Sequence, residues 1–282
     1  MKILTKYFLL GIILILNFSF SSNNPLSESE ANLVFNRLVK SVNSIQTMKF
    51  TLSNEERIGK SMMKGTQQVS MNIDPFQCHI TMIEPGKGEE LVYAGKKYDY
   101  KAVYEPSGFP YFQIELDPYG PLMRKNNHHT IFDLGYGKMM AILQFHMRPG
   151  DYNMKVSEIL RGDKEVYKIE IEFINFKYYT MKVDRVEKLT AIAKRLYLND
   201  YMLSELNDID LWDDLKVGSM IKVPNSYAKK IELYIDKANG LPLSQVVYDE
   251  LGVYEKYDFS NLKINISIPE KRFESEMLGK TI

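Results

Sequence analysis

The chain has 282 residues with 36 basic and 36 acidic side chains, so its formal net charge at pH 7 is zero. Lysine and glutamate are interspersed without a basic cluster, which excludes a nucleic-acid surface and implies no polyanionic partner. The single cysteine, Cys78, excludes an intramolecular disulfide, so a hydrophobic core alone must hold the fold.

Residues 1–22 have the pattern of a secretory signal peptide. Lys2 and Lys6 precede an apolar run from Phe8 to Leu16, and small residues follow that run. The run is too short to cross a membrane comfortably, so we expect cleavage rather than a retained anchor. No cysteine lies near the cleavage site, which excludes acylation as a lipoprotein. The sequence therefore predicts an exported, periplasmic protein.

The mature chain is expected to begin with an amphipathic helix and to continue as strands. Ser27 and Glu30 have capping-box spacing, and the apolar pattern after them predicts a helix that ends near Met48. Its apolar stripe consists of Leu33, Val34, Leu38, Val42 and Ile45. From Phe50 onward the period becomes two, which is typical of strands with one face in water. The clearest alternating sets are Val69, Met71 and Ile73; Tyr167, Ile169, Ile171 and Phe173; Ile231, Leu233 and Ile235; and Leu262, Ile264, Ile266 and Ile268.

Turn signals and a central helix complete the predicted sheet. Gly95-Lys96-Lys97 and Asn239-Gly240 predict hairpin turns, so neighbouring strands should be antiparallel. Between residues 117 and 145, prolines and glycines break the sheet, and a helix follows that contains Met139, Met140 and Leu143. We expect this helix to cover the sheet, which gives a half-open barrel with an apolar interior that can hold a lipid.

Residues 178–226 predict a small module in the order strand, helix, helix, strand. Asn199 or Asp200 is the expected N-cap of its second helix. The apolar stripes of the two helices are Leu189, Ile192, Ala193 and Leu196, and then Met202, Leu203 and Leu206. A closing strand from Met220 to Val223 should pair with Tyr179 to Val183. The module is therefore expected to have its own small sheet.

This module resembles a LysM domain, the family that binds N-acetylglucosamine-containing glycans such as peptidoglycan and chitin. The matching residues are Tyr179, Thr180, Leu189, Ile192, Ala193, Leu206, Asn207, Leu215, Gly218, Ile221, Val223 and Pro224. One departure is the turn from Asp184 to Lys188, which is two residues longer than the family's Gly-Asp-Thr-like turn and lacks its glycine. That turn helps to line the family's groove, so a glycan-binding module and a packed insert that has lost its ligand both stay open. If glycan binds, the resemblance places the contacts at Asp184, Arg185, Glu187, Asn207, Asp208, Ile209 and Leu211.

A second resemblance covers most of the mature chain outside this module. The N-terminal helix leads into three phrases: FTLSNEERIGKSMMKGTQQVSMNI, GEELVYAGKKYDYKAVYEPSGFP and KKIELYIDKANGLPLSQVVYDELGVYEKYDFSNLKI. They resemble the LolA-like superfamily of periplasmic lipoprotein carriers, and within it an exported family of unknown function from Gram-negative bacteria. The resemblance implies an α+β fold in which residues 23–177 and 227–282 form a curved antiparallel half-barrel with covering helices, and residues 178–226 form the small βααβ LysM-like insert. It carries over no catalytic residue and implies that acyl chains bind inside the sheet.

The sequence contains no motif for metal binding or catalysis. The spacings of Cys78, His79, His128, His129 and His146 match no metal site. No G-x-S-x-G, H-E-x-x-H or cysteine–histidine signature is present. The pairs Glu55-Glu56 and Glu89-Glu90 are interpreted as solvated charges on exposed hairpins, because adjacent strand residues face opposite ways. We therefore expect no catalytic group, metal or cofactor.

Two function classes remain. The first is a non-catalytic envelope binding protein that carries or senses a lipid or lipoprotein acyl chain, while the LysM-like module contacts peptidoglycan. The second is a cell-wall-associated structural or envelope-maintenance protein without a lipid cargo. The 15 methionines suit both classes, because thioethers adapt to acyl chains and to an ordinary core. The observation that separates the classes is whether the concave face of the sheet is open and apolar or filled by its own side chains.

Overall fold

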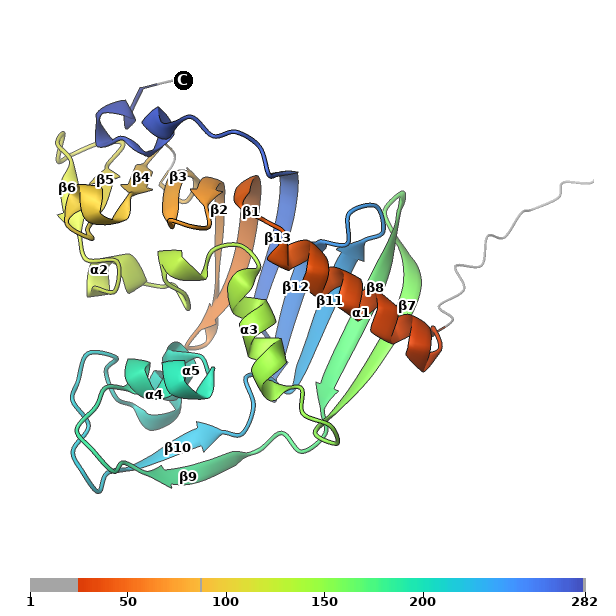
Figure 1. Cartoon of the computed structure of the whole chain (residues 1–282). Coiled ribbons are helices and arrows are strands. Elements are labelled where there is room, and N and C mark those ends of the chain that lie inside the picture. The colour runs from red at the N-terminus through yellow and green to blue at the C-terminus, as the bar shows by residue number, and fades with distance from the viewer. Residues whose placement is uncertain (1–24, 87, 281–282) are drawn as a thin grey trace, which may run out of the picture.

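A computed structural model describes residues 25–86 and 88–280 (Figure 1). The predicted signal peptide, residues 1–22, lies outside them. The described chain contains one open antiparallel sheet of eleven strands. In sheet order the strands are β6 (Ile114–Leu116), β5 (Ala102–Glu105), β4 (Glu90–Tyr93), β3 (Gln77–Glu84), β2 (Ser61–Asn72), β1 (Thr47–Ile58), β13 (Gly252–Ile264), β12 (Pro242–Asp249), β11 (Lys230–Asp236), β8 (Lys164–Phe173) and β7 (Tyr152–Arg161).

Two helices cover one face of this sheet, as predicted. Helix α1 (Glu28–Asn43) and helix α3 (Gly137–His146) lie on the same side and contact each other (Figure 1). Leu38 and Leu143, which are fully buried, join the inward residues of the strands in one continuous core. A short helix, α2 (Pro121–Arg124), and four single 3₁₀ turns complete the unit, which we call the half-barrel. The 3₁₀ turns are Gly95–Tyr98, Ile131–Asp133, Glu270–Phe273 and Ser275–Met277.

The N-terminal helix begins where the sequence predicts and ends earlier. The capping box is present, because the Ser27 hydroxyl accepts from the Glu30 N–H and the Glu30 carboxylate accepts from the Ser27 N–H at 2.9 Å. The predicted end near Met48 is wrong, since α1 stops at Asn43 and β1 starts at Thr47, which pairs with β2. Leu33 was placed on the apolar stripe, but its side chain is 69% exposed.

Most of the predicted strands are confirmed, and one is misplaced. Ile169 on β8 and Leu233 on β11 are fully buried and are paired with each other across the sheet. The predicted strand from Leu262 to Ile268 is wrong beyond Ile264, where β13 ends. Asn265 has a φ of +52°, a left-handed conformation that turns the chain out of the sheet. Asn is one of the few residues that adopts this conformation at low cost.

Both predicted hairpin connections join antiparallel neighbours. Asn239 and Gly240 connect β11 to β12, and Gly240 has a φ of +73°, which favours glycine. Gly95 opens a 3₁₀ turn rather than a tight two-residue turn, yet the flanking strands β4 and β5 still pair. Turn residues therefore predicted the neighbours correctly and the turn type only in part.

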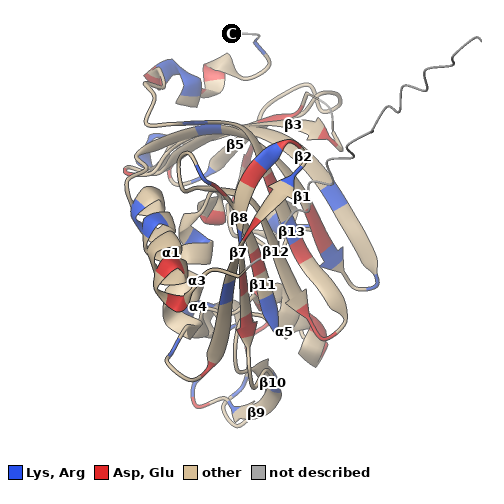
Figure 2. Ribbon diagram, turned by 90° about the vertical axis from the view of Figure 1, so that its right-hand side faces the viewer, with Lys and Arg blue, Asp and Glu red and all other residues tan. Residues whose placement is uncertain are grey.

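Charged residues of both signs are intermixed along the strands (Figure 2). On β8 and β11, Lys168 contacts Glu170 at 3.0 Å and Glu232 at 3.2 Å, and Lys230 contacts Glu232 at 2.8 Å. Such cross-strand ladders alternate with the apolar residues that face the core. One face of the sheet therefore carries intermixed charges. The opposite face is concave, and α1 and α3 cover part of it.

The chain between β8 and β11 forms a separate small layer, which we call the insert. It contains β9 (Tyr178–Lys182), α4 (Leu189–Leu196), α5 (Asp200–Asn207) and β10 (Met220–Pro224), in the predicted order. Strands β9 and β10 pair antiparallel, while β8 and β11 are neighbours in the large sheet, so the insert leaves and rejoins the half-barrel at one place. Its core is Val183, Leu189, Ile192, Ala193, Leu198, Leu203, Leu215, Ile221 and Val223. Across the described residues, every helix is too short or too polar to cross a bilayer.

Candidate binding cavity

A cavity of about 740 Å³ lies on the concave face of the half-barrel. Its walls come from β1 to β6, β12, β13 and α3, and from the segment 122–135, which lies in front of the sheet (Figure 1). Ligand sites in proteins typically have volumes of about 300 to 1,000 Å³. The concave face is therefore open, which is the observation that separates the two predicted function classes.

Apolar side chains dominate the deeper lining of this cavity. On β1, Leu52, Asn54 and Glu56 face the cavity, because alternate strand residues share one face. The apolar lining includes Leu52, Ile80, Met82, Leu91, Tyr104, Ile131, Met139, Ile142 and Phe259. Thioether side chains among them can follow the shape of a flexible apolar ligand. The cavity thus provides an apolar volume with polar groups on one wall.

Two buried carboxylates meet on that polar wall. Glu56 on β1 and Glu255 on β13 are directly opposite each other in the strand register, and they are 3% and 0% exposed. Like charges at opposed positions destabilise a sheet unless other groups compensate them. His128 contacts both carboxylates, since its backbone N–H donates to Glu56 at 2.6 Å and its Nδ1 lies 2.9 Å from Glu255. Tyr257 also donates to Glu56, at 2.7 Å.

Glu255 is the most heavily bonded group in the site. Asn199 donates to it at 2.8 Å, the Tyr227 hydroxyl donates at 3.0 Å, and His129 Nε2 lies 3.3 Å away. Burial alone would raise the pKa of Glu255, but His129 and the hydrogen bond from His128 hold that pKa well below its usual range. Glu255 is therefore ionised in the folded protein.

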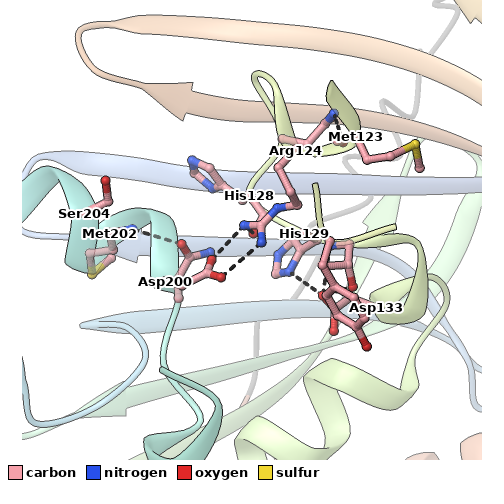
Figure 3. A network of polar contacts seen from close by, with 12 residues as sticks. Met123, Arg124, His128, His129, Asp133, Asp200, Met202 and Ser204 are labelled. Atoms are coloured by element: carbon pink, nitrogen blue, oxygen red, sulfur yellow. Dashed lines mark hydrogen bonds and ion pairs between the residues drawn. The ribbon is translucent and has the colours of Figure 1, made fainter. Parts of the chain in front are cut away.

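His129 lies beside Asp133 at the cavity wall (Figure 3) and also contacts Glu255. Its Nε2 faces Glu255, and its Nδ1 lies 3.8 Å from Asp133. Burial is the largest single effect and would lower the pKa of His129, but the charge of Glu255, its hydrogen bond and the charges of Asp133 and Glu56 together raise the pKa to about 9. At neutral pH this side chain is an imidazolium that offsets the negative charge beside it.

The same cluster continues into the insert. Arg124 forms a two-point ion pair with Asp200, at 2.7 and 3.0 Å, and donates to the backbone carbonyl of His128 at 3.0 Å (Figure 3). Asn199 caps α5 through a bond from the Met202 N–H and also holds Glu255. The first turn of α5 is therefore joined directly to the wall of the cavity.

Further contacts fix the insert against the half-barrel at separate points. The Glu205 carboxylate accepts from the N–H of Gly59 in the β1–β2 turn at 2.6 Å. The Trp212 indole donates to the Tyr119 carbonyl at 3.2 Å, next to α2. The ring of Tyr197 stacks on Phe145 of α3, with centroids 4.7 Å apart. These two hydrogen bonds and the ring stacking hold α4, α5 and the following loop against the half-barrel.

Three of the expected glycan-contact residues are engaged in internal contacts or buried in the folded protein. The Asn207 amide accepts from the Lys222 N–H at 2.6 Å and donates to the Lys222 carbonyl at 2.9 Å, which ties α5 to β10. Ile209 packs against the core of the insert. Leu211 is 3% exposed. The side chains of Asn207 and Ile209 therefore hold the insert together, and that of Leu211 is buried.

The other four expected residues lie at its surface or in an ion pair. Glu187 forms a two-point pair with Arg195, at 2.7 and 3.1 Å. Asp184, Arg185 and Asp208 are exposed, and Arg185 lies 3.5 Å from Glu187. Asp208 has a φ of +53° and ends α5. The exposed part of the predicted site is thus Asp184, Arg185 and Asp208.

The sequence analysis misassigned several groups of the cavity wall. Glu56 was interpreted as a solvated charge, but it is buried, while Glu55 on the opposite face is partly exposed. His128 and His129 were examined for a metal site and not as hydrogen-bonding partners of buried carboxylates, which is the role they have in the cavity wall. Glu255 was not singled out at all. The available signal was the Glu255 position itself, an acidic residue in phase with Tyr257 and Phe259 on the apolar face of its strand.

The comparisons with known proteins give a family match and several distant structural likenesses. A family described as a protein of unknown function, DUF1571, matches residues 45–184, just under half of the chain. No curated protein matches the chain. This matched region runs from β1 into the insert, so it contains most of the cavity wall.

Solved structures resemble the chain at low sequence identity. Crystallised MucB is 11% identical with a TM-score of 0.43, and the alignment covers 88% of this chain and 64% of MucB. The lipoprotein LppX of Mycobacterium tuberculosis is 7% identical with a TM-score of 0.42, covering 86% of this chain and 100% of LppX. A LolA superfamily protein from Nitrosomonas europaea is 12% identical with a TM-score of 0.34, covering 88% and 99%. At these TM-scores the structural likenesses do not identify a ligand. Any inference about the ligand therefore depends on the cavity itself.

Proposed function

We propose that this protein is an exported envelope binding protein that holds the acyl chain of a lipid or lipoprotein in the cavity of the half-barrel. The cavity carries the proposal, because about 740 Å³ of space is lined by apolar side chains at depth and by a hydrogen-bonded charged cluster on one wall. An apolar volume next to fixed polar groups suits an amphipathic ligand. A structural scaffold would have no need of this open space, whose creation costs packing energy.

The apolar lining gives a quantitative expectation. Each methylene group buried from water contributes about 0.8 kcal/mol. Two additional methylenes should therefore strengthen binding roughly tenfold until the chain fills the cavity. A plateau in affinity with chain length would report the length of the cavity.

Native mass spectrometry of protein purified from an envelope fraction without detergent tests this proposal. We expect a discrete added mass that extracts as an acylated species. A clean apo mass, together with no binding of fatty acids of increasing length, would contradict the carrier function and favour the cell-wall scaffold.

Two adjacent glutamines provide a matched pair of variants. Gln67 lines the cavity, whereas Gln68 is exposed and faces the other side of β2. Gln67→Trp should fill the cavity and weaken fatty-acid binding, and Gln68→Trp should leave it unchanged. Equal binding by both variants would place the ligand elsewhere.

For the insert we propose contact with peptidoglycan or another N-acetylglucosamine glycan, as a LysM-like module. Its support is the set of matching residues and the exposure of Asp184, Arg185 and Asp208. Replacing Asn207 and Ile209 would be a poor test, because both residues hold the insert together. Asp184→Ala with Arg185→Ala should instead reduce pulldown on purified sacculi, and Lys194→Ala on the exposed side of α4 serves as the control. Unchanged pulldown in the double variant would remove glycan contact from this turn.

A further inference from the structure

The loop between β5 and β6 exposes a group of aromatic side chains. Phe109 and Tyr111 are 86% and 85% exposed, and Phe112 is 64% exposed. The rings of Phe109 and Tyr111 meet edge to face, with centroids 6.3 Å apart. Single exposed apolar residues are common on proteins, but several large ones on one short loop are not.

This loop lies beside the mouth of the cavity. It connects Tyr104 and Ile114, both of which line the cavity. Its Ser107 lies next to Gly88 in the β3–β4 hairpin, and Gly86 and Glu89 of that hairpin also line the cavity. The exposed aromatic group is therefore continuous with the lining of the binding space.

Two further exposed apolar residues line the cavity from other elements. Leu122 on α2 is 73% exposed and also lines the cavity. Met63 on β2 lines it too and is 38% exposed. Lys64 and Lys125, both exposed, lie among the same lining residues. We call Phe109, Tyr111, Phe112, Leu122 and Met63 the rim.

We propose that the rim docks on the surface of a phospholipid bilayer, so that an acyl chain passes between the membrane and the cavity without crossing water. Phenylalanine and leucine insert at the acyl boundary, and tyrosine is favoured at the headgroup level. Lys64 and Lys125 complement lipid phosphates at that level. The proposal rests on the lipid-binding function proposed above and adds the partner from which the lipid comes.

Co-sedimentation of the full chain with phosphatidylcholine–phosphatidylglycerol vesicles tests the rim. We expect the protein to bind vesicles and the triple variant Phe109→Ser, Tyr111→Ser, Phe112→Ser to bind at least about tenfold more weakly, since each buried aromatic contributes strongly to partitioning. Leu160→Ser with Leu251→Ser is the matched control, because both leucines are exposed away from the rim, Leu160 near the end of β7 and Leu251 in the turn between β12 and β13. This control should bind as the unaltered protein does.

A second measurement separates docking from cargo binding. A fluorescent fatty acid, used below its micelle concentration, should bind the triple variant as tightly as the unaltered protein, which also shows that the variant is folded. Vesicle binding that does not change in the triple variant, or is absent in the unaltered protein, would overturn the rim proposal even if the probe binds. Concentration-dependent dimers that the triple variant abolishes, without vesicle binding, would assign the rim to a second copy of the chain and also overturn it. Rim-dependent vesicle binding without probe binding would instead sustain docking and remove the proposed cargo.

Discussion

In the insert, residues that contact one another are close in the sequence, whereas the cavity wall is assembled from distant segments. Asn207 and Lys222, which tie α5 to β10, are 15 positions apart. Tyr257 and Glu56, which bond across the cavity wall, are 201 positions apart. Local spacing therefore predicts the insert well, and only the strand order of the whole sheet brings the cavity groups together.

One buried polar centre joins the two regions, in addition to the separate contacts of Glu205, Trp212 and Tyr197. Asn199 belongs to the insert as the cap of α5, and its amide nevertheless donates to Glu255 in the cavity wall. Arg124 of the half-barrel and Asp200 of the insert also join the two regions, through a hydrogen-bonded ion pair of 2.7 Å. Substitutions at this centre, in the insert and in the half-barrel should show how far the stability of each region depends on the other.

The largest effect is expected for Glu255→Ala. This change leaves His128, His129 and Asn199 without their common acceptor inside the protein. Removing one partner of a buried charged cluster costs about 3 to 5 kcal/mol. Urea unfolding should show that loss in the free energy of unfolding.

Two other glutamate variants act as controls for that prediction. Glu255→Gln keeps an oxygen acceptor and should cost less than Glu255→Ala. Glu172→Gln, at an exposed position on β8, should change the free energy of unfolding by no more than about 0.5 kcal/mol. A loss at Glu255 as small as the one at Glu172 would mean that the centre does not stabilise the fold.

Leu203→Ala tests whether the insert unfolds on its own. Leu203 is fully buried in the core of the insert, and a leucine-to-alanine change in a core costs about 2 to 5 kcal/mol. Hydrogen exchange should lose protection in residues 178–224 while β11, β12 and β13 keep theirs. Leu206→Ala on the same helix, at a half-buried position, should have a smaller effect. Equal loss of protection in both regions would show that they unfold as one unit.

The sequence predicted much of the fold and little of the cavity wall, for physical reasons. Periodicity identified β8 and β11 because their apolar residues alternate over a full strand, and the capping box located the start of α1. The left-handed Asn265 left no comparable signal, so β13 was extended too far. Glu56 and Glu255 could not be recognised as a pair, because their opposition depends on the β1–β13 register between the two ends of the chain.

The pH dependence of stability should report His129. Its pKa is raised from 6.5 to about 9, so the stabilisation is fully present below pH 6.5 and is lost as the pH rises through 9. We expect a loss on the order of 1 to 3 kcal/mol between pH 6.5 and 9.5. His129→Gln should flatten this slope. His146→Gln should keep it, because burial lowers the pKa of His146 and that group does not titrate in this window.

The smallest effect is expected for the ion pair inside the insert. Arg195 contacts Glu187 at two points, but its side chain is 40% exposed, unlike that of Arg124, which is 4% exposed in its pair with Asp200. An exposed pair contributes about 0 to 1 kcal/mol and is screened by salt. A double-mutant cycle of Arg195→Ala and Glu187→Ala should therefore give a small coupling energy at low salt that disappears in 1 M NaCl, where the Debye length is about 3 Å. The Arg124–Asp200 cycle should keep most of its coupling at the same salt, because water and ions have little access to it. If both pairs responded to salt alike, the junction would be as solvated as the surface of the insert, and the distinction between the two regions would not extend to their electrostatics.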